Sequence, residues 1–106
     1  MVKDELKEKD VEKYLKDEIK KIGGIAYKFV SPGNAGVPDR LVLLPDGLIF
    51  FVELKAPGKK TRKIQDRQID RIEKLGFSVW TIDSKDQVDH LIDFVKGVYK
   101  NGIHTT

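Results

Sequence analysis

Three side chains in the segment 36–55 could do chemistry: Asp39, Glu53 and Lys55, which are ionisable residues in a stretch otherwise rich in Val, Leu, Ile and Phe. Paired carboxylates bind hard cations such as Mg²⁺ or Mn²⁺, which keep several water molecules as nucleophile or for exchange with substrate. The backbone carbonyl of Leu54 can add a ligand. A lysine beside the acids can activate the attacking water and stabilise the charge that builds on a phosphate. The set therefore predicts metal-dependent phosphate-ester hydrolysis.

The acids must face each other for this chemistry, and the surrounding sequence predicts that they do. Pro45-Asp46-Gly47 is a turn signal between two apolar runs, so we expect a tight hairpin of strands 39–44 and 48–55. A three-residue loop sets the antiparallel register so that Asp39 lies opposite Glu53. Because strand side chains alternate, the lysine two residues further on lies on the same face.

Opposed carboxylates need compensation, because like charges directly opposite on a sheet cost about 0.2–1 kcal/mol even when solvated. A divalent cation between them reverses the sign. The alternative without a metal is a cross-strand salt bridge among Asp39, Glu53 and Lys55 at a sheet edge. The letters PD followed by ExK are common and loosely spaced, so the predicted register is what favours a metal site.

Apolar periodicity predicts the elements that position this hairpin, in the order helix, three strands, helix, strand, helix. Besides the hairpin strands, they are a helix at 4–22, a strand at 25–30, a helix that opens in the basic run 59–63 and ends near 75, a strand at 77–82 and a helix capped by Ser84 with Gln87. This order predicts an α/β fold with a mixed central sheet flanked by helices. We expect a single domain over 1–106, with a core at about 8–96 and a frayed tail at 97–106.

The helix that follows the hairpin carries amides on its inner side. Ile64, Ile72 and Leu75 form its predicted inner stripe, and Gln65 and Gln68 project onto the same side. A buried amide costs about 1–3 kcal/mol unless it is hydrogen-bonded, so we expect polar partners for both. The alternative is that one or both lie at the edge of the stripe in water.

Composition bounds the function without specifying it. The 106 residues carry 20 basic and 17 acidic side chains, a net charge of +3 that permits nucleic-acid binding but does not require it. The absence of cysteine excludes disulfides, thiolate zinc sites and cysteine nucleophiles. The start MVKDELKEKD has no apolar signal core and no segment is apolar over a membrane span, so we expect an intracellular, cytoplasmic protein without membrane contact.

A family resemblance covers about residues 8–83. The segments GGIAYKFVSPGNAGVPDRLVLLPDG, FVELKAPG and IQDRQIDRIEKLGFSVWTIDS resemble the VRR-NUC branch of the PD-(D/E)xK nuclease superfamily, and more narrowly its small stand-alone phage-type members that are similar to Holliday-junction nucleases. The resemblance implies a restriction-endonuclease-like αβββαβ core. It also implies a DNA endonuclease dependent on Mg²⁺ or Mn²⁺, working in the host cytoplasm if the chain is phage-encoded.

Residue roles carry over position by position. Asp39 and Glu53 match the metal-binding acids of the family, Lys55 its catalytic lysine and Gln65 a glutamine on the following helix. An acidic residue on the first helix is typical as well. Both Glu8 and Glu12 fit that role, and the sequence does not separate them.

The resemblance further implies a homodimer that presents two sites to branched DNA such as Holliday junctions or flaps. We expect phosphate contacts, which give affinity without base specificity, from six basic residues: Lys28, Arg40, Lys59, Lys60, Arg62 and Lys63. The rival function is a nuclease-fold DNA-binding or assembly module that no longer cleaves. The intact Asp39, Glu53 and Lys55 argue against it.

Overall fold

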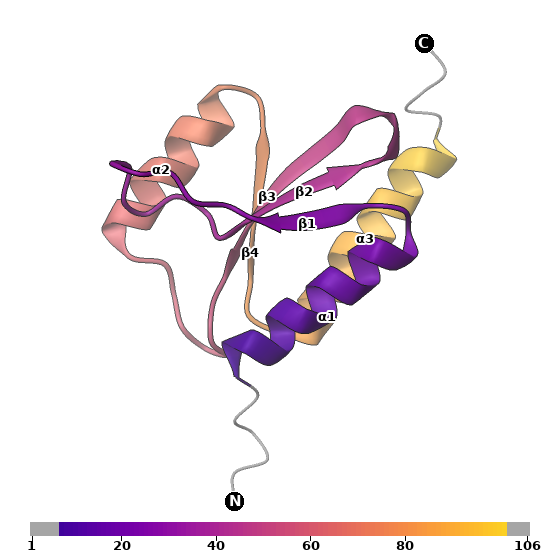
Figure 1. The fold of residues 1–106 in the computed structure, drawn as a ribbon, viewed down its shortest axis with the longest axis horizontal. Coiled ribbons are helices and arrows are strands. Elements are labelled where there is room, and N and C mark those ends of the chain that lie inside the picture. Colours follow the sequence, from indigo (N-terminus) through magenta and orange to yellow (C-terminus); the bar gives the residue numbers. More distant parts are fainter. Residues whose placement is uncertain (1–6, 102–106) are drawn as a thin grey trace, which may run out of the picture.

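The computed structural model describes residues 7–101 and has the predicted order of elements (Figure 1). They are α1 (Glu8–Lys21), β1 (Ile25–Lys28), β2 (Arg40–Leu44), a 3₁₀ turn (Pro45–Gly47), β3 (Leu48–Leu54), α2 (Lys63–Lys74), β4 (Ser78–Ile82) and α3 (Lys85–Lys100). The αβββαβ core expected from the sequence is therefore present, with α3 added after it.

The four strands form one mixed sheet in the order β1-β2-β3-β4, antiparallel except for the parallel pair of β3 and β4. The hairpin register is the predicted one, with Leu44 opposite Leu48 and Arg40 opposite Val52 at the far end of the ladder. Its turn is tight because Asp46 and Gly47 both adopt left-handed φ angles, of 64° and 78°. Asp39 lies one residue beyond the ladder, at the level of Glu53.

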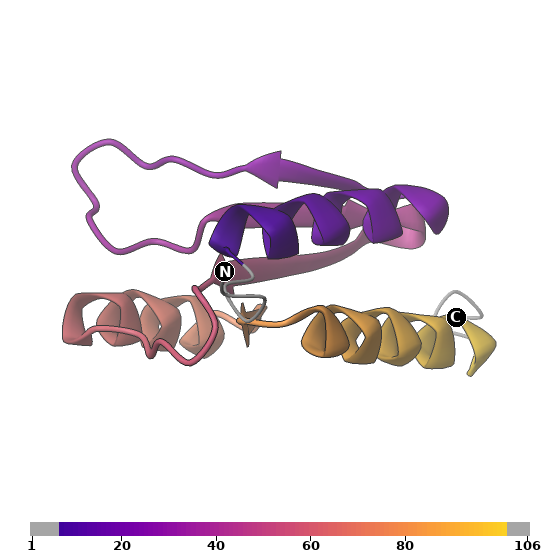
Figure 2. The same ribbon diagram turned by 90° about the horizontal axis from the view of Figure 1, so that it is seen from below.

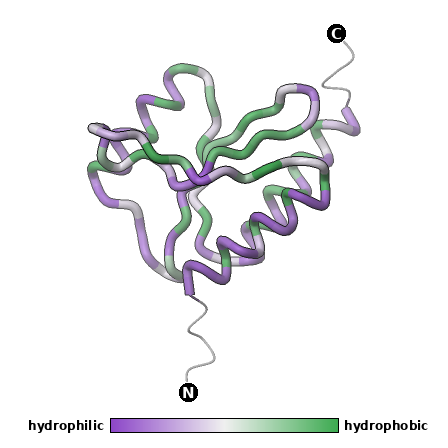
Figure 3. The backbone as a smooth tube through the Cα atoms, viewed as in Figure 1, coloured by the Kyte–Doolittle hydropathy of each residue, from purple (hydrophilic) through white to green (hydrophobic). Residues whose placement is uncertain are grey.

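The hydrophobic core lies between one face of the sheet and helices α1 and α3 (Figures 1 and 2). Val11, Leu15 and Ile19 of α1 recur at helical spacing and are fully buried there. Alternate strand residues point into the same layer, and the tube in Figure 3 shows the strands as the most continuously hydrophobic part of the chain. The fully or nearly buried strand residues of this layer are Val42, Leu44, Phe50, Val52, Leu54 and Ile82.

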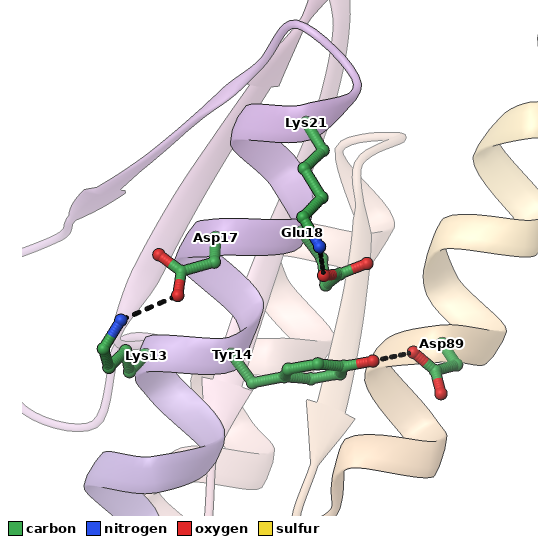
Figure 4. Close-up of polar contacts among 6 residues, drawn as sticks. All are labelled: Lys13, Tyr14, Asp17, Glu18, Lys21 and Asp89. Carbon is green, nitrogen blue, oxygen red and sulfur yellow. Dashed lines mark hydrogen bonds and ion pairs between the residues drawn. The ribbon is translucent and has the colours of Figure 1, made fainter.

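Polar contacts fasten α1 to α3 outside this core (Figure 4). The Tyr14 hydroxyl donates a 2.6 Å hydrogen bond to Asp89 Oδ1. The Lys85 ammonium lies over the Tyr14 ring, 5.5 Å from its centroid. The hydrogen bond to Asp89 raises the pKa of Tyr14 to about 12, because it holds the phenol in its protonated form. The first helix is thereby fixed at a point between its buried positions.

The ends of the helices differ from prediction. Helix α1 begins at Glu8, and residues 4–6 of the predicted helix lie outside the described residues. Helix α3 continues to Lys100, so the expected frayed tail is wrong for 97–100, and 102–106 lie outside the described residues. Within 7–101, no helix is both long and apolar enough to cross a bilayer.

Helix α2 departs most from expectation. It begins at Lys63, so the basic residues at 59–62 precede it. The predicted inner stripe is wrong, because Ile64 is 42% exposed and Leu75 is 77% exposed. The buried residue of this helix is instead Gln65. The helix packs mainly against β4 on the face of the sheet opposite α1 and α3, and turns a polar side chain toward the sheet.

Candidate active site

Asp39 is held at the edge of the hairpin through both its backbone and its side chain. Its carbonyl accepts a 2.7 Å hydrogen bond from the Phe29 N–H, which closes the loop between β1 and β2. Its Oδ2 accepts a 3.0 Å hydrogen bond from the Leu54 N–H. The N–H and C=O of an extended residue point to the same side of a strand, so the Leu54 carbonyl also faces Asp39. The carboxylate is thereby fixed in position while Oδ1 is left for another partner.

Glu53 is buried with one of its oxygens unsatisfied. The residue is 2% exposed, and its Oε2 accepts a 2.7 Å hydrogen bond from Gln65 Nε2 and lies 3.6 Å from the Lys55 ammonium. Its Oε1 is buried and has no hydrogen-bond partner among the described residues. A buried acceptor without a partner costs about 1–3 kcal/mol, and more when it is charged. This oxygen therefore marks a place where a cation would be stabilised.

The electrostatics of Glu53 reflect the same deficit. Burial and then the nearby Asp39 carboxylate raise the pKa of Glu53 to about 7, against the lowering effect of Lys55. The charge of Asp39 therefore disfavours the ionised form of Glu53 across the hairpin. With a pKa of about 7, the Glu53 carboxyl is partly protonated near neutral pH in the metal-free protein.

Gln65 is oriented by the helix that carries it. Its Oε1 accepts a 2.8 Å hydrogen bond from the Arg62 N–H, one of the free donors at the start of α2. The amide nitrogen must then point the other way, to Glu53. The expected polar partners of the two glutamines are both present, since Gln68 Nε2 donates a 3.2 Å hydrogen bond to the Ala35 carbonyl.

The structure separates the two candidate acids on the first helix. Burial and the charge of Asp39 raise the pKa of Glu8 while Lys55 lowers it, so this carboxyl lies within electrostatic range of both residues. Glu12, one turn later, accepts hydrogen bonds from the Arg40 guanidinium at Nε, 3.0 Å away, and at Nη2. Glu12 is therefore engaged in an ion pair with Arg40, and Glu8 is the first-helix acid whose charge is coupled to Asp39 and Lys55.

Arg40 is buried and forms hydrogen bonds within the protein. Only 8% of the residue is exposed, and besides Glu12 its guanidinium binds the Ala26 carbonyl at 3.0 Å. This placement argues against the prediction that Arg40 contacts phosphate. The other predicted phosphate contacts are exposed: Lys28, Lys59, Lys60, Arg62 and Lys63. Except for Lys28, they lie between Lys55 and the first turn of α2, beside the acids.

The donor set suits a small hard cation. No three His, Cys, Asp or Glu side chains among residues 7–101 already surround a common point. Mg²⁺ is usually bound by one or two carboxylates and completes its shell with water, so it does not require three. Asp39 Oδ1, the unpartnered Glu53 Oε1 and the Leu54 carbonyl are oxygen ligands of the right kind.

Sequence reasoning missed the backbone donors at this site, the N–H groups of Phe29, Leu54 and Arg62. No side-chain pattern reports them. The hairpin register could have placed Leu54 beside Asp39. Continuing the register by one residue beyond the pair of Arg40 and Val52 brings Asp39 next to Glu53 and Leu54 on the neighbouring strand. The Arg62 N–H could have been expected from the general need to satisfy the first donors of a helix.

Comparisons with known proteins point to one family. The chain is 57% identical over 81 residues to a protein named "Putative nuclease p44" of Acyrthosiphon pisum secondary endosymbiont phage 1, an alignment that spans 76% of this chain and 87% of that protein. A solved structure described as a VRR_NUC domain superposes with a TM-score of 0.77 at 40% identity, covering 81% of this chain and 94% of the other. No family model matches the sequence.

Proposed function

This chain belongs to the VRR-NUC family, and from that premise we propose that it is a Mg²⁺- or Mn²⁺-dependent endonuclease that hydrolyses phosphodiester bonds of DNA. The observation that carries the proposal is the buried, unpartnered oxygen of Glu53 beside Asp39, with the Lys55 ammonium on the same face. A metal-free salt bridge accounts for Oε2 of Glu53 and leaves Oε1 without a role. A cation at Oε1, together with Gln65 and Lys55 at Oε2, gives both oxygens a partner.

Asp39, Glu53 and the Leu54 carbonyl would hold the cation. When bound, it supplies a Lewis acid for the phosphate and lowers the pKa of a coordinated water. Gln65 keeps the Glu53 carboxylate turned toward Asp39, since its amide donates to the oxygen that the cation would not use. Such supporting hydrogen bonds typically change metal affinity or activity by about 10–100-fold.

Lys55 supplies the group that acts on the reacting phosphate. Its side chain is 14% exposed and its ammonium lies 3.6 Å from Glu53 Oε2. From there it can donate hydrogen bonds to the attacking water and to a non-bridging phosphate oxygen, where negative charge grows during hydrolysis. Glu8 adds a third acid at the margin of the site and raises its affinity for positive charge.

The substrate is held by its backbone. The exposed cations Lys59, Lys60, Arg62 and Lys63 lie in the connection from Lys55 to the start of α2 and form a basic segment close in sequence to the acids. Contacts with phosphates do not depend on the base sequence, so the enzyme would distinguish DNA substrates by their shape. Together with the family resemblance, this supports selectivity for branched DNA such as Holliday junctions or flaps.

A homodimer forms part of the proposal, because a branched duplex offers two strands to two sites. Large apolar side chains that stay exposed at both edges of the sheet and at the end of α2 support it. Ile25 and Tyr27 on β1, Leu75 after α2 and Phe77 before β4 are large apolar residues that are 43–77% exposed. A second copy of the chain is the occupant that we assign to this face, and sedimentation of the protein with Tyr27→Lys as the disrupted variant tests it.

The test of the function is cleavage of a four-way junction, a flap and plain duplex, each with Mn²⁺ or with EDTA. We expect cleavage in Mn²⁺ alone, with the branched substrates cut in preference. Binding of all three DNAs without a cut in Mn²⁺ or Mg²⁺ would instead identify the non-cleaving module. Equal cleavage of duplex and junction would retain the nuclease and reject the branched-DNA selectivity.

A further inference from the structure

The loop between β1 and β2 touches α2 in a way that only glycine permits. Gly36 has a φ of 88°, and a Cβ built on it would lie 2.8 Å from the carbonyl oxygen of Ile64 and 3.0 Å from its carbonyl carbon. These are backbone atoms of the first turn of α2, which cannot move aside as a flexible side chain can. The loop backbone therefore rests directly on the helix at Gly36.

A second contact joins the same two segments one turn further along the helix. Gln68 Nε2 donates a 3.2 Å hydrogen bond to the carbonyl of Ala35, the residue before Gly36. Ile64 and Gln68 are four residues apart and so lie on one side of α2. Figure 1 shows the loop reaching out from the sheet to the side on which α2 lies. The contacts of Gly36 and Gln68 together form what we call the loop latch.

The loop latch connects the two halves of the site. The loop ends at Asp39, three residues after Gly36, whereas α2 carries Gln65, which holds Glu53. Helix α2 packs mainly on β4, whereas Asp39 leads into β2. Strand β3 lies between β2 and β4 in the sheet. The latch thus links the segment of Asp39 to the helix that orients Glu53 by a route that does not pass through the hairpin.

We propose that Gly36 and Gln68 are positioning residues, which clamp the loop onto α2 and thereby set the separation of the Asp39 and Glu53 carboxylates. This inference rests on the proposed function, because the separation matters only if a cation bridges the two acids. Their contacts in the structure are with each other's segments, Gly36 with Ile64 and Gln68 with Ala35, so the role we assign them is indirect. Their effect is expected first in metal affinity.

The chain offers a matched control in the same loop. Gly33 also has a positive φ, of 82°, but a Cβ there would meet no atom within 4 Å. Gly33→Ala and Gly36→Ala therefore introduce similar backbone strain, and only the second pushes the loop off α2. We expect the dissociation constant for Mn²⁺, measured by calorimetry, to rise about ten-fold or more in Gly36→Ala and less than about two-fold in Gly33→Ala.

Gln68→Met tests the other contact and does not depend on whether Gly36→Ala folds. Methionine keeps the length and helix propensity of glutamine but removes the donor to Ala35. We expect weaker Mn²⁺ binding by several-fold, with an unchanged melting temperature of the metal-free protein and unchanged DNA affinity in EDTA. A loss of DNA affinity in EDTA would instead make Gln68 a DNA contact and overturn the proposal.

These measurements distinguish a failure of the positioning role from a failure of the proposed nuclease function. If wild type binds Mn²⁺ and cleaves DNA while Gly36→Ala and Gln68→Met bind Mn²⁺ as tightly as Gly33→Ala, the loop latch has no positioning role and the proposed function stands. If only Gln68→Met can be purified folded, its Mn²⁺ affinity decides alone. If wild type binds no Mn²⁺ and cuts no DNA, the proposed function fails and the latch proposal fails with it.

Discussion

The two faces of strand β3 differ at its end, where two neighbouring residues are equally buried but have opposite roles. Leu54 and Glu53 are neighbours in sequence and each is 2% exposed. Leu54 points into the layer filled by α1 and α3, where burial of an apolar side chain stabilises the fold by roughly 1.5–3 kcal/mol. Glu53 points to the other face, where burial raises its pKa and leaves one oxygen without a partner. Burial on one face thus supports the fold, and on the other it prepares a binding site.

The helices that cover the two faces differ accordingly. Helix α1 presents three fully buried aliphatic residues to its face, whereas α2 buries Gln65 and leaves Ile64 and Leu75 exposed. A helix selected only to seal the sheet would do the reverse. The side of the sheet with the poorer hydrophobic cover is the side that carries the candidate active site.

Among variants that keep the metal bound, the largest expected effect comes from the lysine of the site. Lys55→Met keeps the aliphatic stem and removes the ammonium, so we expect the cleavage rate to fall by about 100- to 1,000-fold while Mn²⁺ binding is retained. Single-turnover cleavage and calorimetry measure the two quantities. The control is Lys96→Met, which removes one exposed positive charge from α3 and should leave the rate unchanged. A Lys55→Met enzyme as fast as wild type would show that this face needs no lysine.

The opposite face should respond in stability alone. Leu54→Ala removes a nearly inaccessible side chain from the layer beneath α1 and α3, and such truncations cost about 2–5 kcal/mol. Urea denaturation measures the change, with Ile49→Ala, a truncation on the less covered face of the same strand, as the matched comparison. An equal loss for both truncations would contradict the asymmetry between the faces.

The third prediction uses pH to separate the faces. The pKa of Glu53 is about 7 in the folded protein and about 4.5 as a free side chain, so between these values the folded state binds a proton that the unfolded chain releases. The unfolding free energy of the metal-free protein therefore falls as pH rises from about 4.5 to about 7, by up to roughly 3 kcal/mol from this group.

Glu53→Gln removes this titration. The variant should keep a flatter stability profile from pH 5 to 8 and should be more stable than wild type at pH 8 without metal. Thermal or urea unfolding at several pH values in EDTA checks this. The prediction fails if the unfolding free energy of wild type rises over this pH range and Glu53→Gln is less stable than wild type at pH 8. That result would mean that other groups in the fold already neutralise the charge of Glu53.

The smallest effect concerns the first helix. Glu8→Gln should reduce Mn²⁺ affinity or cleavage rate by about ten-fold, because Glu8 contributes to the charge of the site without lying at its centre. Glu12→Gln should leave both quantities near wild type and cost about 1 kcal/mol of stability through its bonds with Arg40. The reverse pattern would assign the helix acid to Glu12.

The charged face of the hairpin could be predicted because its geometry is local. Turn length fixes the register of two adjacent strands, and the register brings Asp39, Glu53 and Lys55 together. The polar partners of Gln65 and Gln68 were expected for a similar reason, because the cost of burying an amide does not depend on the details of the fold.

Features that depend on how the helices and strands pack together could not be predicted from the sequence. Glu8 and Glu12 lie one helical turn apart, and only the docking of α1 decides that Arg40 binds Glu12 rather than Glu8. Arg40 was expected at the surface as a phosphate contact, but the edge of β1 offers it the Ala26 carbonyl. The contact of Gly36 with α2 depends on segments far apart in sequence.

The most direct test of the account compares Mn²⁺ binding and DNA cleavage in wild type and Asp39→Asn. Asparagine preserves the acceptor for the Leu54 N–H but removes the negative charge from the predicted metal ligand. We expect wild type to bind Mn²⁺ and to cut DNA only in its presence, and Asp39→Asn to lose both properties while melting at or above the wild-type temperature without metal. Cleavage by wild type in EDTA, or undiminished Mn²⁺ binding and cleavage by Asp39→Asn, would contradict the claim that this face of the hairpin is a metal-dependent nuclease site.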